Sequence, residues 1–308
     1  GHGKVTLLLD EQDRVQQARL HIVEFRGFEK FIQGRPYWEL PVLVQRLCGI
    51  CPVSHHLAAA KACDQLVGAD QLPPTAEKVR RLMHYGQVLQ SHALHFFPLS
   101  SPDLLFGFDD PVAHRNIVGV IQDHPEIARQ GVLLRKYGQE VIRITTGKRI
   151  HGCGAIPGGV NKSVSPVERD ALRADSGQVI AWALDAVALM QHLYEAERTE
   201  FEQFAAVDAN TLSLVDQAGR LELYDGGLRA CDPMGNRLFD HAACNDYRRL
   251  IEEQIKPWSY MKFPFLSVLG AERGWYRVGP LARINNCDRI ETPLAEHARQ
   301  RFIAQGNG

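Results

Sequence analysis

The sequence lacks the charge imbalance, the long apolar run and the dense cysteine spacing that would each define a class of protein. Its 35 basic and 36 acidic residues leave a formal net charge of -1, which is no electrostatic footprint for nucleic acid. No apolar run approaches the roughly 18 residues of a membrane span. Seven cysteines without dense spacing fit a reducing compartment better than a disulfide scaffold. We therefore expect neither a nucleic-acid partner nor a membrane span.

A dinucleotide fingerprint is also missing, because no Gly-x-Gly-x-x-Gly follows a strand. The glycines of Pro157-Gly158-Gly159 are therefore interpreted as relief of backbone crowding and not as a phosphate site. With 308 residues, of which 45% are hydrophobic and 23% charged, the chain has ample apolar material for a buried core. Length alone allows one large domain or two smaller ones.

What the sequence does contain is a Cys-x-x-Cys pair, Cys48 and Cys51, with His55 one helical turn later. The spacing places both sulfurs on one side of a tight turn, where Gly49 is expected to relieve crowding, and thiolates select soft metals. The pair is half of a structural zinc site, a dithiol redox pair, or part of a metal site whose other ligands come from elsewhere. The first interpretation lacks a second closely spaced pair, and the second lacks a preceding strand and a βαβ context.

The predicted fold is mainly helical with small antiparallel β elements, in one domain over residues 1–308. We expect a β-hairpin over residues 1–25, with strands at 5–9 and 15–24, and a β excursion over residues 212–239. The capping box of Ser165 and Glu168, with proline between them, opens a helix that is expected to reach about residue 206. The other predicted helices are 55–68 with Ser54 as its cap, 74–97, 112–137 with an interruption at Pro125, and 292 to the end.

Five segments carry a resemblance to a known family. They are Glu24-Phe25-Arg26-Gly27-Phe28-Glu29, Arg46-Leu47-Cys48-Gly49-Ile50-Cys51-Pro52-Val53-Ser54-His55, Pro157-Gly158-Gly159-Val160-Asn161, Trp258-Ser259-Tyr260-Met261-Lys262-Phe263-Pro264 and Val278-Gly279-Pro280-Leu281-Ala282-Arg283. Together they resemble the large, catalytic subunit of nickel-iron hydrogenases, and in particular its soluble, cytoplasmic, NAD-reducing (bidirectional) branch. Because the likeness runs across nearly the whole chain, it implies the large-subunit fold.

The resemblance implies a role for each motif residue. Cys48 resembles the terminal nickel ligand, and Cys51 resembles the thiolate that bridges nickel to an iron with diatomic ligands. His55 resembles the group that hydrogen-bonds the bridging sulfur, and Glu29 resembles a carboxylate ligand of a nearby structural magnesium ion. Thiolates suit H2 chemistry because they donate electron density to soft metals and accept a proton. The alternative for His55 is an ordinary histidine at the start of a helix, and the alternative for Glu29 is an exposed carboxylate at the end of a helix.

Two segments of the family pattern are absent from the printed sequence. Family members begin with Arg-Ile-Glu-Gly-His and end with a second Cys-x-x-Cys, whereas this chain opens at Gly1-His2 and stops at Gly306-Asn307-Gly308. We therefore expect a truncated subunit with an incomplete set of metal ligands, which is inactive by itself.

Three classes of function follow. The first is the catalytic subunit of a cytoplasmic hydrogenase that passes electrons from H2, through an iron-sulfur small subunit, to NAD in a diaphorase module. The second is a relative of the quinone-site subunit of respiratory complex I, against which both cysteines argue because that branch has lost them. The third is a non-catalytic fragment or a zinc-binding helical protein. Elemental analysis for nickel, iron and zinc discriminates among the three.

Overall fold

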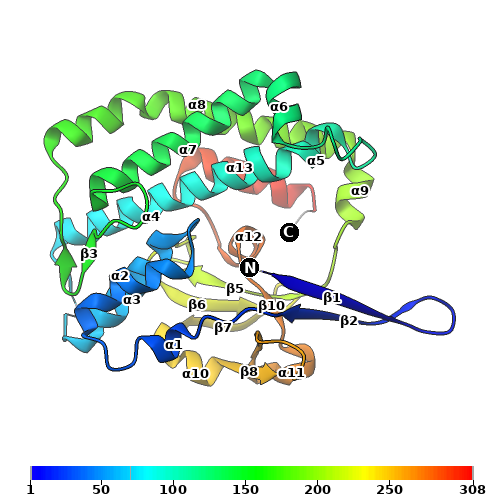
Figure 1. Ribbon diagram of the computed structural model, residues 1–308, viewed down its shortest axis with the longest axis horizontal. Coiled ribbons are helices and arrows are strands. Elements are labelled where there is room, and N and C mark those ends of the chain that lie inside the picture. Colours follow the sequence, from blue (N-terminus) through cyan, green and yellow to red (C-terminus); the bar gives the residue numbers. More distant parts are fainter. Residues whose placement is uncertain (1, 70, 307–308) are drawn as a thin grey trace. The chain divides into compact units, whose positions relative to one another are not determined.

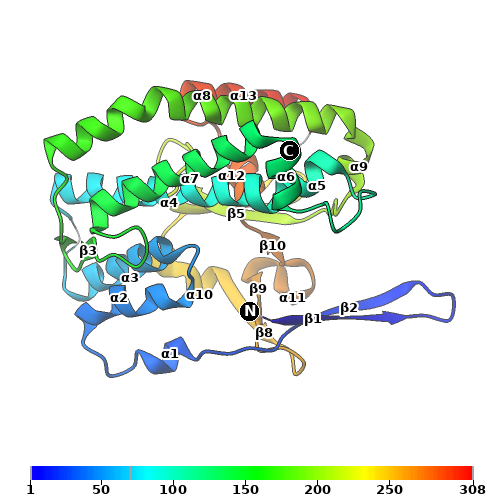
Figure 2. The ribbon, with the colours of Figure 1, turned by 45° about the horizontal axis from the view of Figure 1, so that its top comes forward.

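The computed structural model (Figure 1, Figure 2) describes residues 2–69 and 71–306. The chain divides into two compact units. Gly27–Arg198 is called the helical unit, and Gly1–Arg26 with Thr199–Gly308 is called the mixed unit. The single domain expected for residues 1–308 stays a prediction. Each unit is compact within itself, which is compatible with one domain or with two. Residues 1, 70, 307 and 308, which include parts of both chain ends discussed above, lie outside the described residues.

The helical unit is organised around three long helices, α4 (Pro74–Leu94), α7 (Pro125–Thr146) and α8 (Pro166–Ala196). α7 lies between the other two (Figure 2). Buried apolar side chains from all three helices and the turn after α4 form one cluster: Ala93, Phe97, Leu134 and Val179. This cluster fixes α8, which is otherwise largely exposed.

Two glycines allow α4 and α7 to approach closely. A Cβ added to Gly138 would lie 2.7 Å from the backbone nitrogen of Gln90, and one added to Gly86 would lie 2.7 Å from Cγ1 of Val141. Real Cβ atoms cannot occupy such positions without a shift of the neighbouring backbone or side chain. The two helices therefore meet backbone to backbone at this crossing, and this fixes the position of the middle of α4.

Shorter elements complete the helical unit. α4 ends at Leu94 and passes into a π-helical turn, His95–Ser100, because Pro98 has no N–H to donate to the Leu94 carbonyl. Short 3-10 segments occupy Tyr37–Glu39 and Val44–Leu47. The remaining elements are α1 (Phe28–Phe31), α2 (Leu40–Leu43), α3 (Pro52–Leu66), α5 (Ser101–Phe106), α6 (Ile117–Asp123), β3 (Ala155–Ile156) and β4 (Gly159–Val160).

The mixed unit contains a four-stranded sheet in the order β10-β5-β6-β7. β5, β6 and β7 pair antiparallel, and β10 pairs parallel with β5. Leu212, Ala230 and Leu266 form the core. The strands of this sheet are β5 (Asn210–Val215), β6 (Gly227–Cys231), β7 (Arg237–Ala242) and β10 (Tyr276–Arg277). A separate antiparallel pair consists of β8 (Ile251–Ile255) and β9 (Lys262–Leu266). The helices are α9 (Arg198–Gln203), α10 (Tyr247–Leu250), α11 (Gly270–Arg273), α12 (Pro280–Asn286) and α13 (Pro293–Ala304).

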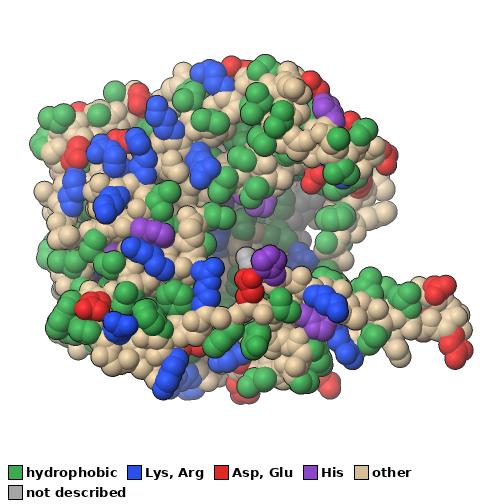
Figure 3. Space-filling model, in the orientation of Figure 1, with side chains coloured by type: hydrophobic (Ala, Val, Ile, Leu, Met, Phe, Trp, Pro, Cys, Tyr) green, Lys and Arg blue, Asp and Glu red, His purple; other side chains and the backbone are tan. Residues whose placement is uncertain are grey.

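The amino-terminal strands β1 (Gly3–Leu9) and β2 (Val15–Ile22) form the antiparallel hairpin that the sequence predicts. Val5 lies opposite Leu20 and Leu7 opposite Ala18, so these side chains share one face of the ribbon. Val5 is 64% exposed and Leu7 is 55% exposed. Apolar side chains are visible along the hairpin at the right of Figure 3. The hairpin therefore presents an apolar face to solvent.

Proline is the first residue of α3 and of α7, and the predicted start of α3 was wrong. α3 begins at Pro52, so Ser54 lies inside its first turn and is not the cap. The predicted interruption at Pro125 is confirmed, because α6 ends at Asp123 and α7 begins at Pro125. In both cases the fixed φ of proline suits the first helical position, where no N–H is needed.

Other expectations are confirmed or corrected by the same structure. The capping box is present, because Ser165 Oγ accepts from the Glu168 amide over 3.2 Å and Glu168 accepts from the Ser165 amide over 2.9 Å. α8 ends at Ala196 and not near residue 206, since Glu197 (φ -123°, ψ 38°) leaves the helical conformation. The mainly helical class with small antiparallel sheets is confirmed. In residues 2–69 and 71–306, none of the helices combines the length and apolar character required to cross a bilayer.

Candidate metal-binding thiol pair

Cys48 and Cys51 lie on a tight turn that leads into α3. Cys48 follows the 3-10 segment Val44–Leu47 with an extended backbone, φ -144° and ψ 129°, and Cys51 takes the cap position in front of Pro52. The Cys51 amide donates to Cys48 Sγ over 3.3 Å. Both thiols are free and half-buried. The turn therefore gathers two sulfur donors at the amino-terminal end of one helix.

The two thiols differ in proton affinity. Burial raises the pKa of the Cys51 thiol to about 11, and the hydrogen bond with Cys48 and the charge of the Cys48 thiolate add to the rise. Burial also opposes ionisation of Cys48, but hydrogen bonds from the Cys51 thiol and from the Cys51 and Ile50 backbone outweigh it and lower the Cys48 pKa. The amino-terminal end of α3 favours negative charge in the same place. Cys48 therefore ionises first.

The turn is held by side chains of α4. Gln87 and Gln90 donate to the carbonyl oxygen of Ile50 over 3.0 and 2.9 Å. The expected role of Gly49 was wrong, because a Cβ added there would meet nothing within 4 Å. The conformation of the turn therefore depends on hydrogen bonds from α4 and not on the small size of Gly49.

Adjacent histidines at the start of α3 have different surroundings. His55 is half-buried in the first turn of the helix. His56 is 1% exposed; its Nδ1 lies 2.6 Å from the Pro41 carbonyl oxygen and its Nε2 accepts from the Ala155 amide over 2.9 Å. Burial lowers the His56 pKa, so the partners assign a neutral ring with its proton on Nδ1. His56 is therefore a structural histidine that connects α3 to α2 and β3.

The other end of α3 is fixed through the turn between β3 and β4. Asp64 accepts from the Gly158 amide over 2.7 Å and pairs with the buried Arg80. Gly158 has φ +81°, and a Cβ there would touch only Ala69 at an ordinary 3.8 Å. The interpretation of this glycine as relief of crowding was therefore wrong: the turn requires its left-handed backbone angle.

The predicted magnesium ligand lies on a short helix. Glu29 is an exposed residue in the first turn of α1. In the part of the chain that the structure describes, no three His, Cys, Asp or Glu side chains are grouped to hold a metal ion. Cys48 and Cys51 therefore offer two donors only, and the metal roles of His55 and Glu29 stay predictions.

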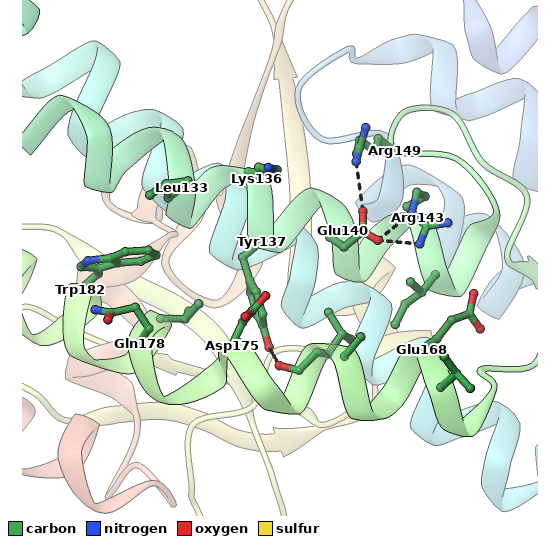
Figure 4. A pocket seen from close by; sticks show the side chains of 15 residues that line it. Leu133, Lys136, Tyr137, Glu140, Arg143, Arg149, Glu168, Asp175, Gln178 and Trp182 are labelled. Carbon is green, nitrogen blue, oxygen red and sulfur yellow. Dashed lines mark hydrogen bonds and ion pairs between the residues drawn. The ribbon is translucent and has the colours of Figure 1, made fainter.

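A cavity of about 620 Å³ lies between α7 and α8, and the described residues that line it include no cysteine (Figure 4). Glu140 pairs with two arginines of the lining, since it lies 2.6 Å from Arg143 and 3.2 Å from Arg149. The Tyr137 hydroxyl donates to the Leu172 carbonyl over 3.0 Å. The cavity is therefore distinct from the thiol pair.

Sequence reasoning missed Gln87, Gln90, His56 and the Asp64–Arg80 pair. A signal exists in retrospect, since Gln87 and Gln90 are spaced three residues apart beside Met83, on the buried face of an amphipathic helix. Polar residues at such positions need a specific partner. The partner itself, a carbonyl 37 residues away, cannot be identified from the spacing.

Family models match the amino-terminal third of the chain. A model described as "Nickel-dependent hydrogenase" matches residues 26–106, which contain both motif cysteines. A model described as "HoxL-like" matches residues 1–25.

Individual relatives match along almost the whole chain. It is 46% identical over 321 residues to the beta subunit of the NAD-reducing hydrogenase HoxS of Cupriavidus necator, covering 100% of this chain and 65% of the relative. It is 43% identical over 303 residues to one subunit of the F420-non-reducing hydrogenase vhu of Methanocaldococcus jannaschii, covering 98% and 72%. The chain therefore spans about two thirds of the length of these relatives.

Solved structures agree with the fold. The crystal structure of an NAD+-reducing NiFe-hydrogenase in the H2-reduced state matches with a TM-score of 0.95 and 59% identity, covering 98% of this chain and 67% of that one. The NiFeSe hydrogenase from D. vulgaris Hildenborough matches with a TM-score of 0.74 at 22% identity, covering 99% and 68%. At 22% identity, the second match supports the same fold and carries no information about function.

Proposed function

Because the chain belongs to the nickel-dependent hydrogenase family, we propose that it supplies two thiolate ligands to a nickel-iron centre that oxidises H2 reversibly. The products of the forward reaction are two protons and two electrons. The observation that carries the proposal is the placement of the Cys48 and Cys51 thiols, unbonded and linked by an N–H···S hydrogen bond.

The donor set fits such a centre. Two thiolates on one turn are soft ligands, which nickel and low-valent iron prefer to oxygen donors. The amino-terminal end of α3 and the hydrogen bond from the Cys51 amide to Cys48 Sγ favour the thiolate form, which is the form that binds metal. When bound, the centre supplies the Lewis acidity and the redox change that cleavage of H2 requires. Cys48 would be the terminal nickel ligand, and Cys51 would bridge nickel and iron.

Neighbouring side chains would adjust the charge of the two donor sulfurs and would hold a magnesium ion. As a free thiol, Cys51 has a pKa that burial raises to about 11, so metal binding would release its proton. His55, one turn further along α3, would hydrogen-bond the bridging sulfur and reduce its charge. Glu29 would contribute a carboxylate to a magnesium site, a role that suits an exposed oxygen ligand with several waters.

The electron path would run outside this chain. Its seven cysteines stand apart except for the motif pair, so the iron-sulfur clusters would belong to a small subunit, whereas NAD would bind in a diaphorase module. The names of two relatives, which describe an NAD-reducing hydrogenase and an NAD+-reducing NiFe-hydrogenase, support NAD as the acceptor. Because the proposed electron acceptor is NAD, which is used in the cytoplasm, we also propose a cytoplasmic location.

The test replaces each thiol in the complete subunit, produced with its partner. Cys48→Ser and Cys51→Ser keep the shape of the side chain but remove a soft ligand, so H2-dependent dye reduction should be lost together with nickel or iron. His55→Gln should keep the metals and lower activity by about 10- to 100-fold. Elemental analysis and dye reduction are measured on the same samples.

Cys244→Ser is the matched control, because Cys244 is an exposed thiol of the mixed unit. Its activity and metal content should equal those of the wild type. Full activity in Cys48→Ser or Cys51→Ser would contradict the proposed ligands, and zinc in place of nickel and iron in the wild type would favour a structural zinc protein.

A further inference from the structure

Two buried amide groups converge on one carbonyl oxygen beside the thiol pair. Nε2 of Gln87 and Nε2 of Gln90 lie 3.0 and 2.9 Å from the oxygen of Ile50. The two side chains are 2% and 4% exposed, so both donors are largely shielded from water. Their spacing of three residues places them on the same face of α4. One helix therefore supplies both donors.

The Ile50–Cys51 peptide group links the two glutamine hydrogen bonds to the thiol pair. In a planar trans peptide the C=O and N–H bonds point in opposite directions. With the oxygen held by α4, the Cys51 N–H points to the other side, where Cys48 Sγ accepts it at 3.3 Å. The glutamines therefore set the direction of an N–H···S bond from across the peptide plane.

The helix that carries the glutamines is fixed at the same level. A Cβ added to Gly138 would lie 2.8 Å from Cβ of Gln90, so α7 packs directly on the base of this side chain. A donor on so closely packed a backbone has little freedom to follow a moving acceptor. The position of the Ile50 carbonyl is thus imposed by the core of the helical unit.

We propose that Gln87 and Gln90 are positioning residues of the metal site, which hold the Cys51 N–H on Cys48 Sγ and thereby set the electron density this sulfur gives to a bound metal. The inference rests on the proposed function, which assigns Cys48 as a metal ligand. A hydrogen bond to a ligand sulfur withdraws electron density and makes the bound metal easier to reduce. Each amide contributes part of this effect.

The test compares four forms of the complete subunit with its partner: wild type, Gln87→Leu, Gln90→Leu and the double variant. Leucine keeps most of the side-chain volume and removes the donor. The double variant should retain nickel and iron, because both thiols remain, and its metal centre should have a lower midpoint potential in a redox titration followed by electron paramagnetic resonance. The single variants should lie between wild type and double variant.

Hydrogen exchange provides a readout that needs no metal. The Cys51 amide should exchange up to about tenfold faster in the double variant, which is the loss expected for one hydrogen bond. The amide of Leu134, in the core of the same unit, should keep its rate. A general loosening of the fold would instead accelerate both amides.

Gln139→Leu, at a half-buried position of α7, is the matched control and should change neither measurement. Unchanged potential and unchanged Cys51 exchange in the double variant would overturn the proposal. If the double variant holds no metal, the single variants decide, and wild-type values in both would overturn it equally. A wild-type enzyme without nickel would contradict the proposed function, while the exchange of the Cys51 amide would still test the glutamines.

Discussion

Arg80 and Asp64 form a two-pronged ion pair in the interior of the helical unit. Nη1 lies 2.6 Å from Oδ2 and Nη2 lies 3.1 Å from Oδ1. Arg80 is fully buried and Asp64 is 6% exposed. The same guanidinium donates to the carbonyl oxygens of Ile156 and Gly159 over 2.7 and 3.0 Å. The pair therefore joins α3, which Cys51 caps, to α4 and to the turn between β3 and β4.

Arg80→Met should destabilise the helical unit strongly. The substitution leaves the Asp64 carboxylate buried without its cation and leaves two carbonyl oxygens without a donor. Breaking a buried pair in this way costs about 3 to 5 kcal/mol of the free energy of unfolding. Urea denaturation followed by circular dichroism measures the loss.

The exposed pair of Arg129 and Glu126 provides the control. Its atoms lie 2.8 Å apart, but the two side chains are 56% and 61% exposed, so Arg129→Met should cost far less stability than Arg80→Met. Equal costs for the two substitutions would show that the pair of Arg80 does not stabilise the unit as its burial implies.

Gly138→Ala should destabilise the protein although alanine favours helices. The new methyl group would lie 2.7 Å from the Gln90 nitrogen and 2.8 Å from the Gly86 oxygen, and overpacking of this kind costs about 1 to 3 kcal/mol. Gly177→Ala, in the exposed interior of α8 where nothing lies within 4 Å, should stabilise by about 0.5 to 1 kcal/mol. Thermal denaturation should thus shift in opposite directions for the two variants, and stabilisation by both would refute the close approach of α4 and α7.

Helix starts could be predicted from the sequence to the extent that they depend on neighbouring residues. The box of Ser165 and Glu168 was found because its partners lie three residues apart, whereas Pro52 displaced the predicted cap because proline prefers the first helical position. Parallel pairing of β10 with β5 was not predicted, since its partners, Tyr276 and Asn210, are far apart in the sequence and a two-residue strand leaves no periodic signal.

The site could be predicted only as two thiols. The spacing of Cys48 and Cys51 indicates a soft metal or a redox pair, and the choice of nickel came from the resemblance of the surrounding residues. Gln87 and Gln90 could not be assigned to the turn, because their role depends on a carbonyl that folding brings to α4. Hydrogen bonds to backbone atoms leave almost no trace in the sequence, since every residue carries the same acceptor.

Stability should depend on pH through His114. Its Nδ1 lies 2.9 Å from Asp110 Oδ2 and its Nε2 lies 3.0 Å from Asp123 Oδ2. The hydrogen bond with Asp110 outweighs desolvation, and with the two carboxylate charges it raises the His114 pKa above 6.5. Because the folded state binds this proton more tightly than the unfolded state, the stabilisation is complete below about pH 6.5 and is lost as the pH rises through the folded pKa.

Urea midpoints measured between about pH 5.5 and pH 8.5 test the contribution of this histidine. The wild type should lose more stability across this interval than His114→Gln, which cannot take up the proton. Parallel pH profiles for the two proteins would contradict the bridging role. A nuclear magnetic resonance titration of the His114 ring should place its midpoint above 6.5.

The 308-residue chain, purified alone, should contain nickel and iron well below one atom of each per chain. Cys48 and Cys51 supply two soft donors, and the described residues offer no further grouping of His, Cys, Asp or Glu that would complete a site. Metal affinity depends on a full ligand set in a closed pocket, and Ile50, between the thiols, is 53% exposed. Elemental analysis should therefore separate this chain from the complete subunit produced with its partner in the same cells. Stoichiometric nickel and iron in the chain alone would show that two thiolates suffice to retain the centre.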